Sequence, residues 1–238
     1  MKKFMIIVPI ILGLIIIFTI AKSQMNTVVS VTGSVFNSVT KDPIRVQYQL
    51  LDENGKIIRR GKTNAAQNGY YFVTGLEPGK KYKMKFIGDN NYFDAEFDID
   101  IPQTDKYAEF SKDFLVPPKS KGMELPQRVP VFELNKSKLR GGAEFFLDEI
   151  LKLLKSNPNM KFSIIAYPDN NLNPDANLEL TKKRCESLKQ FFIQNGIDGN
   201  KISIEPKSST DPNNPPPTEK RAKGKRYIGS VYYYINEF

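Results

Sequence analysis

The residues of this chain best placed to do chemistry are two of opposite charge, Asp169 and Arg184. A loop rich in Asn, Asp and Pro separates them and connects a strand-like segment, 161–166, to a helix-like one. A carboxylate and a guanidinium in these places can bind each other, or together bind a ligand that carries both charges. We expect Arg184 in the opening turns of the helix, where unpaired backbone N–H groups and the helix dipole also favour a bound carboxylate.

The composition excludes most catalytic sites. The 238 residues contain no His, no Trp and one cysteine, Cys185, so Cys–His zinc sites, Ser-His-Asp triads and Cys-His dyads are ruled out. Cys185 is interpreted as a small helix-packing residue. A carboxylate pair such as Asp169 with Asp175 or Glu179 is compatible with the composition. Nothing in the pattern around them indicates a raised carboxyl pKa, so we expect a non-catalytic protein with no cofactor and no metal.

The first residues, 1–23, have the parts of a secretory signal peptide. Met1-Lys2-Lys3 is followed by an apolar run over 4–20 and then by Ala21-Lys22-Ser23, which predicts cleavage after Ser23. The alternative is an uncleaved membrane anchor, because the apolar run approaches the minimum length of a spanning helix. We expect membrane association only in that case or through a partner protein.

The basic balance of the chain gives little information about its partner. Lys and Arg total 35 and Asp and Glu 26, a net charge of +9. In a cytosolic protein this would suggest a nucleic acid partner, but export argues against one, and we expect none. Lipid headgroups and cell-wall carboxylates are the anions outside the cytoplasm, while a solvated basic surface is the plainest interpretation of most of these side chains.

Residues 24–116 are predicted to form an all-β domain. Short alternating runs, such as those at 28–32 and 45–50, are separated by the turn signals Asn54-Gly55, Asn68-Gly69 and Pro78-Gly79. Both central positions of an Asn-Gly hairpin turn favour positive φ. About seven strands in a segment of this length indicate a small β-sandwich.

This segment resembles the carboxypeptidase-regulatory-like, transthyretin-like β-sandwich family. The matching residues are Gly33-Ser34-Val35, Asp42-Pro43-Ile44, Asp52-Glu53-Asn54-Gly55, Thr63-Asn64, Asn68-Gly69-Tyr70-Tyr71-Phe72, and Leu76-Glu77-Pro78-Gly79 before Tyr82. The resemblance implies a structural or binding module without chemistry of its own. Separately, we hypothesise that this domain contacts another envelope protein. Tyr70, Tyr71 and Phe72 are interpreted as core residues rather than as a platform for carbohydrate.

Residues 117–128 combine prolines, charges and a glycine without periodicity, which predicts a short linker. Beyond it, strand-like segments at 129–132, 161–166, 201–204 and 227–235 alternate with helical patterns at 139–154 and 180–192. This order predicts a mixed sheet with two helices on one face, and an α+β chain overall. The proline-rich segment 205–217 is interpreted as a surface connection, followed by a short helix at 218–223.

The order and motifs of residues 129–238 resemble the OmpA-like peptidoglycan-binding domain. Val131-Phe132-Glu133-Leu134-Asn135, followed by Leu139, resembles the family's first strand and the approach to its first helix. Asp169, Asn177, Leu180-Thr181 and Arg184 stand where the family has an Asp, an Asn, a Leu-Ser pair and an Arg, with the same interval from Asp to Arg.

The resemblance implies a site for the peptidoglycan stem peptide, whose diaminopimelate ends in an ammonium and a carboxylate on one carbon. Asp169 would take the ammonium and Arg184 would bind the carboxylate with both arms of its guanidinium. Phe132, Asn135 and Asn177 belong to the implied site; we expect Asn177 to cap the helix and Leu180 to lie in the core. The alternative is that Asp169 and Arg184 form a structural salt bridge.

The last part of the family pattern is matched less closely. Lys225 and Arg226 stand where the family has two Arg residues, and they are the expected second cation of the site. Pro168, Leu172 and Gly224 depart from the family, which leaves open an altered ligand or a retained scaffold. We predict a periplasmic protein of a diderm bacterium, associated with the cell wall or outer membrane, that anchors an envelope component to peptidoglycan. The alternative is an assembly protein that uses the fold for protein contacts only.

Overall fold

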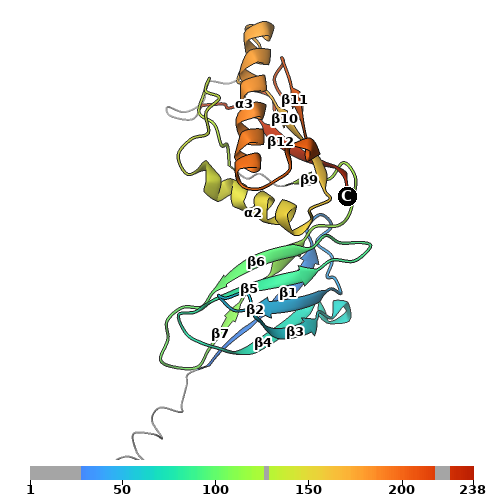
Figure 1. Cartoon of the computed structure of the whole chain (residues 1–238), viewed down its shortest axis with the longest axis vertical. Helices are drawn as coiled ribbons and strands as arrows, with labels where there is room; N and C mark the ends of the chain where they lie inside the picture. Colours follow the sequence, from blue (N-terminus) through green and yellow to red (C-terminus); the bar gives the residue numbers. More distant parts are fainter. Residues whose placement is uncertain (1–27, 126–128, 218–225) are drawn as a thin grey trace, which may run out of the picture. The chain divides into compact units, whose positions relative to one another are not determined.

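The computed structural model describes residues 28–125, 129–217 and 226–238 (Figure 1). The predicted signal peptide, 1–23, and the predicted helix at 218–223 lie outside the described residues. The chain divides into two compact units, one within Met1–Lys85 and Phe97–Leu115 and the other within Phe86–Glu96 and Val116–Phe238. No helix in the described part is long and apolar enough to cross a membrane.

The N-terminal strands form two four-stranded sheets, which confirms the all-β prediction. The first has the order β4-β1-β7, with β8 also paired to β1; its strands are β1 (Val29–Asn37), β4 (Tyr70–Leu76), β7 (Ala108–Ser111) and β8 (Phe114–Val116). The second has the order β3-β2-β5-β6, made of β2 (Gln47–Leu51), β3 (Ile57–Lys62), β5 (Lys81–Ile87) and β6 (Ala95–Asp100). A short 3₁₀ helix, η1 (Ala65–Gln67), precedes β4.

Strand β4 corrects one prediction about the core. Tyr71 is buried and its ring contacts that of Phe114, but Tyr70 and Phe72 are each 44% exposed. Successive side chains of a strand point to opposite faces, so three consecutive aromatic residues cannot all face one core. Tyr70 and Phe72 therefore lie on the outer face of the sheet.

The Asn-Gly turns follow the expected chemistry in part. Asn68 and Gly69 both have positive φ, 56° and 68°, as predicted. At Asn54-Gly55 only the glycine does, with φ 77°, because the turn is linked to a register shift between Leu50 and Leu51. The extra residue of a bulge lets a hairpin close with a single left-handed position.

The second unit is a mixed sheet with two helices, as predicted. Its strand order is β11-β10-β12-β9, in which β10 (Lys161–Ala166) pairs parallel with β11 (Ile202–Pro206) and antiparallel with β12 (Val231–Glu237). The helices are α2 (Ala143–Ser156) and α3 (Pro174–Gln194), and a 3₁₀ turn, η2 (Gly199–Lys201), leads into β11. Figure 1 shows α3 in orange, running across the strands β10 and β11.

The core of this unit lies between the sheet and the helices. Alternate residues of β10 and β12 face it, and the helices contribute residues at intervals of three and four. Its members include Phe162, Ile164 and Ala166 of β10, Tyr233 and Ile235 of β12, Leu147, Ile150, Leu151 and Leu154 of α2, and Cys185, Leu188 and Phe192 of α3.

The predicted linker and the first predicted strand both need correction. Within 117–128, residues Glu124–Leu125 form β9, which pairs with Tyr233 and Tyr234 of β12, and Leu125 is buried. The segment 129–132 forms no strand and contributes one isolated bridge, between Phe132 and Leu139. A two-residue strand is too short to show alternation in the sequence, so β9 left no pattern to detect.

Tyr233 provides a test of how the core tolerates polar groups. Its hydroxyl is buried and has no hydrogen-bond partner among the described residues. An unsatisfied buried hydroxyl is destabilising, so Tyr233→Phe is expected to raise the free energy of unfolding by about 1 kcal/mol. Urea unfolding measures the change. The matched control is Tyr71→Phe, which loses a 2.7 Å hydrogen bond to the Lys112 carbonyl and should lower stability by about 1 kcal/mol. A less stable Tyr233→Phe protein contradicts the prediction.

Stability is also expected to fall at alkaline pH. Burial raises the pKa of Cys185 from 9.0 to about 12, and burial places the pKa of Tyr233 well above 10.0. As pH rises, both groups lose their protons in the unfolded chain before they do so in the folded one, so this stabilisation is complete below about pH 9 and declines above it. Urea midpoints measured between about pH 8 and pH 11 should decrease, and Tyr233→Phe should weaken the dependence. A midpoint that stays constant over this range contradicts the expectation.

Candidate functional site

Asp169 and Arg184 lie together, bonded directly to each other. The distance from Arg184 Nη1 to Asp169 Oδ1 is 2.8 Å and that from Nη2 to Oδ2 is 2.9 Å. Both side chains are fully buried, with 0% exposure. Asp169 follows the end of β10 and Arg184 projects from α3, so the pair joins the sheet to the helix.

Backbone carbonyls occupy the remaining donors of Arg184. Its Nε donates to the Lys136 carbonyl at 2.9 Å, Nη2 to that of Glu133 at 3.1 Å, and Nη1 to that of Tyr167 at 3.4 Å. The guanidinium also lies over the ring of Phe132, 5.2 Å from its centroid. All five N–H groups that an arginine offers therefore have acceptors.

The carboxylate of Asp169 is satisfied as completely. Besides its bonds to Arg184, Oδ2 accepts the backbone N–H of Asn135 at 2.7 Å and Oδ1 accepts that of Gly229 at 2.7 Å. Asn135 adopts φ 56°, a left-handed conformation that Asn tolerates better than most residues. The pair thus connects the segment before α2, the end of β10, helix α3 and the segment before β12.

Because Asp169 and Arg184 are bonded to each other, the space between their charges has no room for a ligand. A zwitterion can bind both charges only by exchange, with its ammonium replacing Arg184 at Asp169 and its carboxylate replacing Asp169 at Arg184. The segment 133–136 donates to or accepts from both partners, so it must move for this exchange to occur. Without that movement the pair acts as a structural bridge.

Two expectations about α3 were wrong. The helix begins at Pro174 and its cap is Asn173, whose Oδ1 accepts the N–H of Ala176 at 3.1 Å, so Asn177 is not the cap. Proline suits the first helical position, because its fixed φ fits and its missing N–H would be unpaired there. Arg184 consequently lies in roughly the third turn, away from the unpaired N–H groups and the dipole of the helix start.

Asn177 holds two loops to the helix instead. It is buried, and its Nδ2 donates to the carbonyls of Asn170 at 2.6 Å and Ser208 at 3.2 Å. One turn later, Thr181 Oγ1 donates toward the carbonyl of Lys207 at 2.9 Å. Leu180, expected in the core, is only half-buried.

The segment expected to supply a second cation contacts the pair through a backbone group. Lys225 lies outside the described residues, and Arg226 is exposed. The contact from this part of the chain comes from the backbone of Gly229, which sequence analysis missed. A Cβ at Gly229 would lie 2.0 Å from the Tyr167 carbonyl oxygen, so only glycine fits there. Gly229 lies near the start of the strand predicted at 227–235, and a glycine within a strand often marks a place where another backbone segment comes close. This was the feature of the sequence that could have indicated the contact.

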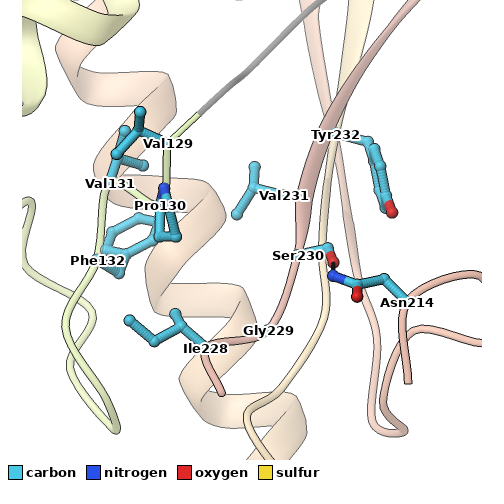
Figure 2. Close-up of a pocket in the computed structure, with 10 residues that line it drawn as sticks. All are labelled: Val129, Pro130, Val131, Phe132, Asn214, Ile228, Gly229, Ser230, Val231 and Tyr232. Carbon is cyan, nitrogen blue, oxygen red and sulfur yellow. Dashed lines mark hydrogen bonds between the residues drawn. The ribbon is translucent and has the colours of Figure 1, made fainter. Parts of the chain in front are cut away.

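A pocket adjoins the ion pair (Figure 2). It has a volume of about 230 Å³ and lies between the segment Val129–Phe132 and the segment Ile228–Tyr232, with Asn214 on the same side as Ser230. Phe132 and Gly229 belong both to its wall and to the surroundings of the pair. Its lining side chains are apolar, hydroxyl or amide groups, and none is charged.

The loop 207–217 fixes the polar side of this pocket. Asn214 Nδ2 donates to Ser230 Oγ at 3.0 Å, the dashed contact in Figure 2, and the Tyr232 hydroxyl donates to the buried carboxylate of Asp211. Burial, together with this bond to Asp211, raises the pKa of Tyr232 to about 12, so its hydroxyl is a neutral donor. No group of Asp, Glu and Cys side chains in the described ranges is arranged to hold a metal ion.

The ion pair should dominate the stability of this unit. Arg184→Met is expected to cost about 3–5 kcal/mol, because it leaves a buried carboxylate unpaired. Asp169→Asn/Arg184→Met should cost clearly less than the sum of the two single changes, since the double variant contains no unpaired buried charge and the amide oxygen still accepts one of the two backbone N–H groups, that of Asn135 or that of Gly229. Urea unfolding of the four proteins measures this coupling. Additive losses, or a loss below about 1 kcal/mol in Arg184→Met, contradict a structural pair.

Known proteins and families are similar to parts of this chain. One similar structure is the TIE protein of Bacillus anthracis, which is 16% identical over 38% of this chain and 16% of that one, with a TM-score of 0.32. Another is the major pilin subunit BcpA of Bacillus cereus, which is 16% identical over 37% of this chain and 29% of that one, with a TM-score of 0.29. A third is the 5-hydroxyisourate hydrolase of Klebsiella pneumoniae, which is 19% identical over 38% of this chain and 91% of that one, with a TM-score of 0.30. This chain spans less than a third of the first two proteins.

The OmpA family model matches residues 131–226, a range that contains Asp169, Arg184, α2, α3, β10 and β11. The predicted OmpA-like domain is thereby confirmed, and residues 131–226 of this chain are an OmpA family domain.

Proposed function

We propose that this chain is a non-catalytic protein of the bacterial cell envelope whose OmpA domain binds the stem peptide of peptidoglycan. OmpA family domains generally bind peptidoglycan and are typically non-catalytic. The observation that carries the proposal is the bidentate Asp169–Arg184 pair. It holds one anion and one cation in direct contact, where four segments of that domain pack together.

Exchange is the mechanism that fits this pair. Diaminopimelate presents an ammonium and a carboxylate on one carbon, so it can replace each partner of the pair with a group of the same charge. The buried site then contains equal numbers of positive and negative groups before and after binding, which avoids an unpaired buried charge. The segment 133–136 acts as the gate, because its backbone contacts both Asp169 and Arg184.

The other residues expected at this site also have roles in the proposal. Asn135 would meet the ligand as the gate opens, and Phe132 supports the face of the Arg184 guanidinium. Asn177 positions the loop after β10. Arg226, exposed beside the segment that carries Gly229, and Lys225 supply the second cation.

The anchoring role extends the proposal to the whole chain. After export and removal of residues 1–23, the OmpA domain would bind the cell wall in the periplasm. The N-terminal sandwich would then connect this anchor to another component of the envelope.

A second candidate function is supported by the burial of the same pair. Every N–H of Arg184 and both oxygens of Asp169 are already satisfied within the protein, so the fold needs no ligand to complete it. In this alternative the domain is a scaffold for contacts with other envelope proteins, and the pair serves stability alone.

Changing the ligand separates the two functions without disturbing the fold. Residues 24–238 are sedimented with insoluble sacculi that contain diaminopimelate and, in parallel, with sacculi that contain lysine in its place. Lysine has the ammonium but lacks the second carboxylate, so Arg184 would be left without an anionic partner. We expect at least about tenfold weaker binding to the lysine sacculi.

Two protein variants complete the experiment. Arg226→Ala removes an exposed cation and should weaken binding several-fold without loss of stability, whereas Phe145→Ala, at a 78% exposed position on α2, is the matched control and should bind like wild type. Equal binding to both kinds of sacculi refutes the exchange mechanism. Absence of binding to either favours the scaffold.

A further inference from the structure

The outer face of the sheet β4-β1-β7 carries two exposed aromatic rings. Tyr70 and Phe72 are each 44% exposed and stand two residues apart on β4, so they point to the same side, about 7 Å apart along the strand. On the neighbouring strand β1, Ser34 pairs with Tyr70 and Thr32 with Phe72. The rings therefore border a row of small hydroxyl side chains.

That row continues across the sheet as a hydrogen-bonded chain. Ser30 is fully buried, and its Oγ donates to Thr74 Oγ1 at 2.8 Å. The Tyr107 hydroxyl lies 3.3 Å from Ser30 Oγ and 3.2 Å from Glu109 Oε2, so Ser30 links the exposed Thr74 and Tyr107 from below. Tyr107 is 60% exposed and places a third ring on the far side of the hydroxyls. The surface thus alternates aromatic faces with hydroxyl groups and includes one carboxylate.

The absence of Lys and Arg from the strands of this face argues against an acidic ligand. No Lys or Arg occurs in β1, β4 or β7, whereas in the other sheet β3 contains two Arg and one Lys and β5 contains three Lys. A phosphate-bearing or otherwise acidic polymer would find no cation on these strands. A protein interface is also a poor fit, because it needs a larger apolar centre than two half-exposed rings provide.

We infer that this face, defined by Tyr70, Phe72, Thr32, Ser34 and Tyr107, binds an uncharged glycan made of N-acetylated amino sugars. The electron-rich face of an aromatic ring attracts the weakly positive C–H groups on the flat side of a sugar ring. Ser and Thr hydroxyls can both donate to and accept from sugar hydroxyls, and Glu109 can accept an amide N–H. The choice of amino sugars rests on the proposed function, since such sugars form the glycan strands of peptidoglycan.

Binding at this face would give the chain a second contact with the polymer. The OmpA domain would hold the stem peptide, and the sandwich would hold the sugar backbone to which that peptide is attached. Two weak contacts on one polymer increase the overall affinity beyond either alone, because the second forms within an existing complex.

The test uses a soluble glycan that carries no peptide. Isotope-labelled protein of residues 24–238 is titrated with an oligomer of N-acetylglucosamine, and amide chemical shifts are followed by NMR. Changes should concentrate on β4 and β1. Phe72→Ala and Tyr70→Ala should each weaken binding about tenfold, and Tyr70→Phe, which keeps the ring, should retain most of it.

Phe145→Ala, which removes an exposed ring from α2, is the control and should leave the affinity unchanged. Thermal unfolding confirms that each variant is folded. Absence of shifts on β4 and β1, or unchanged affinity in Phe72→Ala, overturns the inference. The oligomer carries no stem peptide, so this result is independent of the sacculus experiment: failure of either leaves the other measurement valid.

Discussion

The buried ion pair between Asp169 and Arg184 is the interaction on which the second unit depends. Removing two charges from water is costly, and their attraction offsets that cost only when the remaining hydrogen-bonding groups are also satisfied. Here three backbone carbonyls and two backbone N–H groups satisfy them. Three of these groups lie in the segment 133–136, one is the carbonyl of Tyr167 after β10 and one is the N–H of Gly229 before β12, so forming the pair also fixes the path of these three segments.

The same arrangement explains how a stable core and a binding site can share two residues. A hydrophobic pair of similar volume could fill the space with less desolvation. It could not exchange with a zwitterion. The use of backbone groups rather than further charged side chains keeps the buried site neutral overall. A ligand of matched charges could therefore enter at little electrostatic cost once the segment 133–136 has moved.

Much of this architecture could be predicted from the sequence, for identifiable reasons. Strand 161–166 alternates clearly and is bounded by polar residues, and it appears with the predicted limits. The approach of Asp169 to Arg184 was likewise predicted. The start of α3 was misplaced because the apolar pattern begins at Leu180, although Asn173-Pro174 is a stronger start signal. The Asn135 and Gly229 contacts use main-chain atoms, which every residue has, so side-chain types could not reveal them.

The net charge of +9 does not identify the binding partner of this chain. It suggests an acidic partner, yet the buried Arg184 is neutralised by Asp169, and β1, β4 and β7 have no Lys or Arg; Arg226 supplies an exposed cation at the proposed stem-peptide site. Elsewhere lysines face acidic neighbours, as Lys81 faces Asp100 at 4.0 Å and Lys183 faces Glu179 on α3. Such exposed pairs contribute little energy and are screened by salt. Recognition of a polymer that is itself nearly uncharged, except at the ends of its peptides, would use aromatic faces, hydroxyl groups, one exchangeable ion pair and the cation of Arg226 rather than most of the excess of basic residues.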